Sequence, residues 1–118
     1  MTRPVVVTEP GRGHRVGNVE FLARTVDTPF FNLGVVVLEP GQGVPSHVHD
    51  EEDDSFLVLE GTLSLVLGED DREVHAGAGC FVLVPAGTPH AIANEGTCDV
   101  RVLNVHAPGG FDRRIGLR

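Results

Sequence analysis

Glycine and proline interrupt this chain so often that long helices are excluded. Among its 118 residues are 15 glycines and 8 prolines, and the longest stretch free of both runs only from Ser46 to Glu60. Proline removes a helical hydrogen bond and clashes with the preceding turn, and glycine costs conformational entropy. The chain must therefore fold from short elements, which favours β-strands joined by turns.

Apolar, β-branched segments recur between these turn signals, and each is long enough for one strand. We predict eight of them: Val5–Thr8, Val19–Ala23, Asn32–Leu38, Ser55–Leu59, Thr62–Leu67, Cys80–Val84, His90–Asn94 and Val100–Val105. Short strands at this spacing are typical of an antiparallel sandwich or barrel, so the fold class is all-β.

Two of these segments predict opposite surroundings. In Thr62–Leu67 the leucines at 63, 65 and 67 share one face, and Thr62 and Ser64 lie on the other, which is typical of a half-buried strand. The segment Phe81–Val84 is apolar at every position, so we expect both of its faces to be covered, one by the core and the other by a neighbouring sheet or subunit.

Composition excludes several classes of function. The formal net charge is −8, and residues 25 to 100 carry most of the acidic excess, so we expect no binding to nucleic acid. Without lysine, Schiff-base and P-loop chemistry are excluded. No apolar run is long enough for a signal peptide or a membrane span. Cys80 and Cys98 have no metal or redox spacing, so we expect reduced thiols and a cytoplasmic protein.

The strongest chemical signal is His47-Val-His49. In an extended strand, residues two apart point to the same face about 6.5 to 7 Å apart, so both imidazoles can reach one ion. Five acidic residues, Asp50 to Asp54, follow directly. Such a run is usually a solvated loop, but carboxylates beside imidazoles also suit Fe(II), Mn(II), Ni(II) or Zn(II).

The order of these residues resembles the first motif of the cupin superfamily, G-x5-H-x-H-x(3,4)-E-x6-G, from Gly41 through Asp54 to Gly61. The second motif, G-x5-P-x-G-x2-H-x3-N, is similar to the stretch from Gly79 through His90 to Asn94. The resemblance implies a jelly-roll β-barrel forming a single domain over residues 1–118, with a core of about 20–107 and flanking arms. It also implies one divalent metal ion held by His47, His49, His90 and a carboxylate.

Asp54 stands where the family usually has glutamate, one methylene longer. Its register with Gly61 favours Asp54 as the ligand; the alternatives are a water in the shell or substitution by Glu51 or Glu52. Asp54 or Glu52 is the candidate catalytic base. We expect ordinary roles for His14 and His75.

The chain looks most like small quercetin-dioxygenase-like cupins, which implies a metal-dependent dioxygenase acting on a small flavonol- or enol-like compound. A metal-dependent isomerase or cyclase would use the same site, and a non-catalytic ligand-binding protein is the third reading, because a fold does not fix a function. Candidates for the substrate pocket are Phe56, Phe31 and His106. We expect a homodimer with a small-molecule substrate and no membrane partner.

Overall fold

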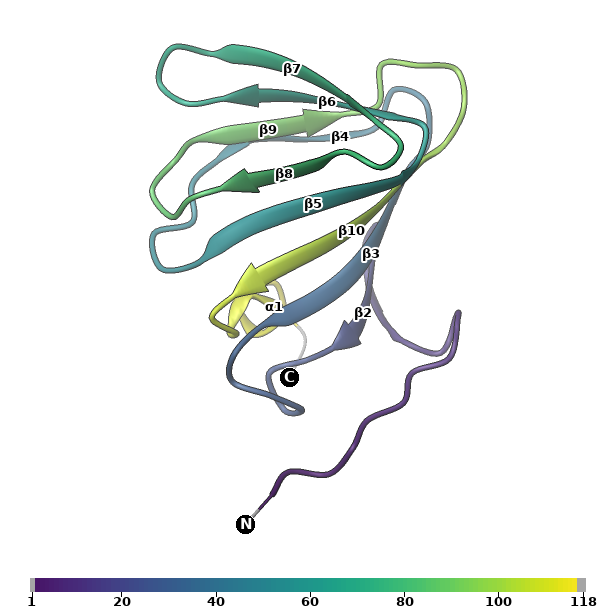
Figure 1. Cartoon of the computed structure of the whole chain (residues 1–118), viewed down its shortest axis with the longest axis vertical. Helices are drawn as coiled ribbons and strands as arrows, with labels where there is room; N and C mark the ends of the chain where they lie inside the picture. Colours follow the sequence, from purple (N-terminus) through teal and green to yellow (C-terminus); the bar gives the residue numbers. More distant parts are fainter. Residues whose placement is uncertain (1, 117–118) are drawn as a thin grey trace.

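The computed structural model describes residues 2–116 as ten strands and one short helix (Figure 1). The strands are β1 (His14–Val16), β2 (Val19–Ala23), β3 (Asn32–Leu38), β4 (Gly43–His47), β5 (Asp53–Glu60), β6 (Thr62–Leu67), β7 (Arg72–Gly77), β8 (Phe81–Val84), β9 (His90–Ala93) and β10 (Val100–Ala107). The helix α1 (Phe111–Arg114) follows β10. The all-β prediction is confirmed.

The strands form two antiparallel sheets that face each other. The first has the order β1-β2-β3-β10-β5-β8, and the second has the order β4-β9-β6-β7. Figure 1 shows the second sheet above the first, with α1 beside the end of β10. Two facing antiparallel sheets with these crossovers are a jelly roll, as expected.

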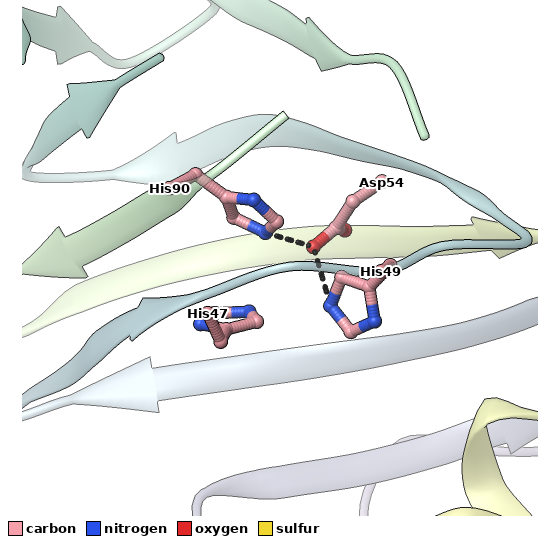
Figure 2. Close-up of side chains that lie close together, drawn as sticks. All are labelled: His47, His49, Asp54 and His90. Atoms are coloured by element: carbon pink, nitrogen blue, oxygen red, sulfur yellow. Dashed lines mark hydrogen bonds and ion pairs between the residues drawn. The ribbon is translucent and has the colours of Figure 1, made fainter. Parts of the chain in front are cut away.

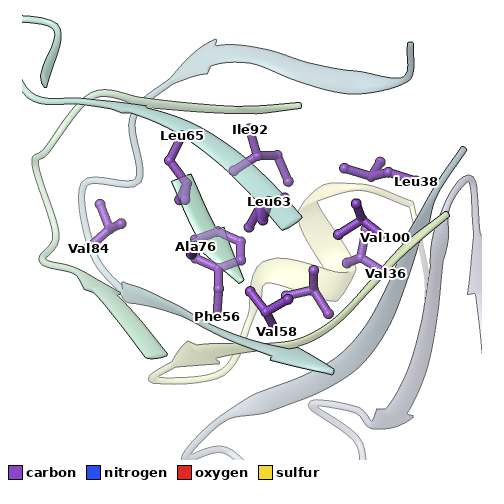
Figure 3. Close-up of a cluster of buried hydrophobic side chains, with 11 residues drawn as sticks. Val36, Leu38, Phe56, Val58, Leu63, Leu65, Ala76, Val84, Ile92 and Val100 are labelled. Carbon is purple, nitrogen blue, oxygen red and sulfur yellow. The ribbon is translucent and has the colours of Figure 1, made fainter. Parts of the chain in front are cut away.

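The core fills the space between the sheets, and strand alternation determines which side chains enter it (Figure 3). On β6, Leu63 and Leu65 are buried while Thr62 is exposed, which confirms the predicted alternation. Phe56 and Val58 of β5 meet them from the other sheet. Burying each such side chain contributes about 1.5 to 3 kcal/mol, so this layer holds the two sheets together.

Four glycines of the two motifs hold turns that other residues enter only with strain. Gly41, Gly61, Gly79 and Gly87 all have positive φ, between 78° and 89°. At Gly61 a Cβ would also lie 2.7 Å from the backbone oxygen of Asp99. These turns set the register with which the histidines of the two motifs enter the barrel.

One predicted strand needs correction. Val5–Thr8 is not a strand, because within the described residues no neighbouring strand pairs with it; its valines are exposed, and Thr8 Oγ1 donates to the oxygen of Leu22. Within this chain the strand β8 is covered on one face only: Val84 is buried, whereas Phe81 is 63% and Leu83 55% exposed. No neighbouring sheet of the described residues covers the second face, and cover by a second subunit stays a prediction. The strands β1, β4 and β7 lack long apolar runs and were not predicted.

Within residues 2–116, no helix has the length and apolar character that a membrane crossing requires.

Candidate metal centre

Four side chains, three from strands and one from a loop, meet inside one end of the barrel (Figure 2). His47 is the last residue of β4, His49 lies two residues beyond it, Asp54 is in β5, and His90 is the first residue of β9. Each offers one nitrogen or oxygen atom, and these four atoms lie within 4.8 Å of one another. The resemblance pointed to these same four residues.

The turn before β9 places His90 opposite His47. The two residues are direct partners in the antiparallel β4–β9 pair, and their ring centroids are 4.2 Å apart. The sequence reasoning placed His47 and His49 on one extended strand, but β4 ends at His47 after an irregularity that begins at Val44. The loop, rather than strand alternation, therefore brings His49 to the site.

Backbone carbonyls orient two of the imidazole rings. His47 Nδ1 lies 2.8 Å from the oxygen of Pro45, and His90 Nδ1 lies 2.9 Å from the oxygen of Thr88. A carbonyl only accepts, so Nδ1 of each ring carries the proton and donates. Nε2 of each ring is left to face the centre of the cluster.

His49 has a buried nitrogen that nothing in the described part of the chain satisfies. Its Nε2 has no hydrogen-bond partner there, and the nearest carboxylate oxygen, Asp54 Oδ2, is 3.6 Å away. Burial, with the neighbouring His106, lowers the pKa of His49 from 6.5 to about 4. The ring is therefore neutral at physiological pH, and its lone pair points at the cluster, as a metal ligand requires.

Asp54 is the only carboxylate of the four and is almost fully buried. Oδ2 lies 3.0 Å from His90 Nε2, while Oδ1 accepts from Asn104 Nδ2 at 2.6 Å and lies 3.4 Å from His106 Nε2. Burial alone would raise the pKa of Asp54, but these contacts hold it well below its ordinary value. Asp54 is therefore ionised.

The His90–Asp54 contact brings two electron-donating atoms together. His90 Nε2 and Asp54 Oδ2 lie 3.0 Å apart, and neither residue is exposed. Burial alone lowers the pKa of His90, but the bonds to Asp54 and to Thr88 raise it above 6.5. Three imidazole nitrogens and one carboxylate form a suitable donor set for Fe(II), Mn(II), Ni(II) or Zn(II).

Glu52 supports the site from outside. It is 1% exposed, and its Oε1 lies 3.4 Å from His49 Nδ1, on the opposite side of the ring from the cluster. Arg114 of α1 forms an ion pair with the same carboxylate. A carboxylate on the outer nitrogen of a ligand histidine fixes the orientation of the ring. Glu51 is exposed on the surface.

A cavity of about 180 Å³ opens next to the cluster. One end is polar, with Asp54, Asn104 and His106, and the remainder is mostly apolar. Its full lining is Asn18, Val19, Val36, Val44, His47, Asp54, Phe56, Ile92, Asn104, His106 and Phe111. A polar end beside the metal ligands and an apolar body suit a small organic ligand.

Three pocket residues predicted from the sequence can be compared with the lining of this cavity. Phe56 and His106 line it. Phe31 does not line it: this residue precedes β3 and lines a separate recess beside the N-terminal arm. Asn104 and Phe111 are among the lining residues that the prediction missed. Asn104 could have been found, because it shares a strand face with His106, but nothing in the sequence pointed to Phe111.

The remaining histidines lie elsewhere. His14 is exposed on β1, and His75 is exposed on β7, where its Nδ1 is 3.1 Å from Ser64 Oγ.

Comparison with known proteins identifies the family to which the chain belongs. A model of the cupin domain matches residues 34–106, which include the whole four-residue cluster. The chain belongs to the cupin family. Helix α1 lies outside the matched residues.

Relatives of this cupin are similar in sequence or in structure. An uncharacterised protein of Acanthamoeba polyphaga mimivirus is 28% identical over 102 residues, 80% of this chain and 64% of that protein. Quercetin 2,3-dioxygenase of Bacillus subtilis is 39% identical over 59 residues, 48% of this chain and 17% of that enzyme. The chain thus spans less than two thirds of either relative.

A solved structure confirms the fold. A conserved Klebsiella pneumoniae protein with a double-stranded β-helix domain superposes with a TM-score of 0.70 and 25% identity, covering 87% of this cupin and 84% of that chain.

Proposed function

We propose that this cupin binds one divalent transition-metal ion through His47, His49, His90 and Asp54. The observation that carries the proposal is the buried, unpartnered lone pair of His49 facing an ionised carboxylate and two further imidazoles. A buried polar atom without a partner is costly, so a protein that keeps one within reach of three other donors has a use for it.

We further propose that the site is that of a dioxygenase acting on a small enol-like compound. When bound, the ion offers open coordination positions for oxygen and for a chelating substrate. The cavity supports this, because its polar end adjoins the metal ligands and its apolar wall, including Val36, Phe56 and Ile92, excludes water from the body of the substrate. The similarity to quercetin 2,3-dioxygenase over 59 residues also supports it.

In this proposal Asp54 is a ligand rather than the base. A general base works best with a pKa near the operating pH, and the pKa of Asp54 is held far below it. Glu52 acts through His49 as a positioning residue, because it contacts that ring and does not line the cavity.

The test begins with elemental analysis of protein purified without a histidine tag. A stoichiometric transition metal that is lost in the His47→Ala, His49→Ala, His90→Ala triple variant supports the site. Oxygen uptake is then followed with a panel of small enols and flavonols. Uptake that needs both metal and substrate supports the dioxygenase. Substrate conversion without oxygen uptake indicates an isomerase or cyclase, and ligand binding without conversion indicates a non-catalytic binder.

We also propose that two copies pair through the outer face of β8. This strand is at the edge of its sheet and leaves Phe81 and Leu83 exposed, next to the exposed Leu59 of β5. Exposed apolar side chains on an edge strand favour association with a second chain.

The cytoplasm remains our proposed compartment. Cys80 and Cys98 are both free and exposed, which suits a reducing environment.

A further inference from the structure

Helix α1 contributes one aromatic ring, that of Phe111, to the lining of the cavity. Phe111 lies parallel to His106, with ring centroids 3.8 Å apart and an interplanar angle of 12°. Its ring also meets the edge of His49 at 5.2 Å and forms part of the cavity lining. The wall of the cavity next to His49 and His106 is therefore built in part from a segment outside the residues that the family model matches.

This segment is anchored to the barrel by a buried carboxylate. Asp112 is 2% exposed; its Oδ2 accepts from the backbone N–H of Thr25 at 2.9 Å, and its Oδ1 accepts from Thr25 Oγ1 at 2.6 Å. The backbone N–H of Asp112 donates to Asn32 Oδ1 at 3.0 Å. These bonds join the helix to the connection between β2 and β3, so Phe111 is a fixed wall.

The volume of the cavity that Phe111 lines limits the size of the ligand. The cavity holds about 180 Å³. An apolar cavity of about 150 Å³ binds benzene, whereas sites for drug-sized ligands occupy about 300 to 1,000 Å³. A single ring with its oxygen substituents fits the space, and the three-ring body of a flavonol does not.

We propose that Phe111 determines ligand size in this cupin: it admits single-ring or smaller enol chelators and excludes flavonols. The proposal rests on the metal site proposed above, because the chelating end of the ligand is placed there. It narrows the substrate class to compounds in which the enol and its neighbouring oxygen occupy most of the molecule.

The test compares two ligands with the same chelating group and different bodies. Maltol presents a hydroxyketone on one ring, and 3-hydroxyflavone presents the same group on a three-ring frame. Both are titrated calorimetrically into Co(II)-loaded protein, so the readout is binding and not turnover. We expect the unmodified protein to bind maltol at least about tenfold more tightly than 3-hydroxyflavone, since a pocket rejects oversized groups sterically.

Removing the ring should reverse the exclusion. Phe111→Ala is expected to tighten 3-hydroxyflavone binding by about tenfold or more while maltol changes by less than about threefold. Phe111→Leu, which keeps more of the packing, is expected to give a smaller gain and serves if the alanine variant does not fold. Phe30→Ala removes an exposed ring that is not part of the cavity and should change neither affinity. Equal 3-hydroxyflavone affinity in all folded variants, or tight binding by the unmodified protein, would overturn the proposal.

Metal content, measured first, separates this proposal from the one on which it rests. If no metal binds, the proposed function fails, and the size test is repeated on metal-free protein with phenol and 2-naphthol, followed by NMR. Naphthol binding that appears only in the Phe111 variants then supports the role of the ring, and naphthol binding to the unmodified protein rejects it.

Discussion

Replacing Asp54 by asparagine keeps the shape of the side chain and removes its negative charge, which tests whether the carboxylate is a metal ligand. Asn104 Nδ2 donates to Asp54 Oδ1 at 2.6 Å, so it will hold the carbonyl oxygen of the new amide at the Oδ1 position. The amide NH2 group then takes the place of Oδ2, which lies 3.0 Å from His90 Nε2 and 3.6 Å from His49 Nε2. An amide NH2 donates and does not ligate a cation. Asp54→Asn therefore removes a ligand atom and the single negative charge of the four-residue cluster.

The expected loss of metal affinity follows from the position of Asp54 Oδ2 within the cluster. Changing an outer-shell partner of a metal site already costs about 10- to 100-fold in affinity. Losing a ligand atom and its charge should cost at least the upper end of that range, about 100-fold in Kd or about 3 kcal/mol. Competition between the protein and a chromophoric chelator for Co(II) or Zn(II) measures this directly. Asp54→Glu restores the usual residue of the family, and we expect it to keep Kd within about tenfold.

The matched control is Asp53→Asn, one residue away. Asp53 is exposed, and its Oδ1 accepts from the backbone N–H of Ala86, outside the cluster. This change should leave metal affinity unaltered. An unchanged Kd in Asp54→Asn would refute the assignment of the carboxylate, and Glu52, the remaining buried carboxylate beside His49, would become the candidate.

Four further predictions follow from the same structure. Alanine at any one of the three ligand histidines should abolish stoichiometric metal binding, whereas His75→Ala should retain it; equal metal content in all four variants would contradict the site. Metal at about 100 times its Kd should stabilise the folded chain by about 2.7 kcal/mol in thermal melts, and an unchanged melt would argue against a site confined to the folded state. In metal-free protein, NMR should find the His49 ring titrating near pH 4 and the His90 ring above 6.5. In the unfolded chain both rings take up a proton near pH 6.5. The stability that the neutral His49 ring contributes should therefore be lost as the pH falls from 6.5 towards 4, whereas the stability that the protonated His90 ring contributes should be lost as the pH rises above 6.5. Identical titration of both rings would refute this. Finally, Phe81→Arg should convert a sedimenting dimer to a monomer of 12.6 kDa, and a wild-type monomer at micromolar concentration would reject the pairing.

The fold could be predicted where strands carry their own pattern. The alternation in Thr62–Leu67 gave the bounds of β6 correctly, because one face packs on the core and the other meets solvent. Val5–Thr8 has equally strong β propensity but pairs with nothing in the described chain. A strand forms only where a neighbouring strand supplies backbone hydrogen bonds, and the local sequence pattern does not show whether such a neighbour exists. The strand β7 is the opposite case: its six residues include few large apolar side chains, yet they pair with β6.

The four residues of the cluster could be named from the motif spacing, but their surroundings could not. The role of Asn104 depends on the register that puts it opposite Phe56 and within reach of Asp54, 50 positions earlier. Phe111 reaches the cavity only because Asp112 is bonded to Thr25, 87 positions away. Such contacts are made by tertiary packing, which a single sequence does not display.

The place of β10 in the first sheet determines when this protein can fold during synthesis. Among the described residues every other strand precedes it in the sequence, yet it lies between β3 and β5 and pairs with both. Until residue 107 has emerged, β2–β3 and β5–β8 have no strand to join them into one sheet, and the nascent chain keeps their apolar edges unpaired. Asn104 and His106 arrive on the same strand. The two sheets should therefore fold only after β10 has been translated, slowly, as expected where most pairings are distant in sequence, and with greatest need of chaperone protection just before that strand emerges.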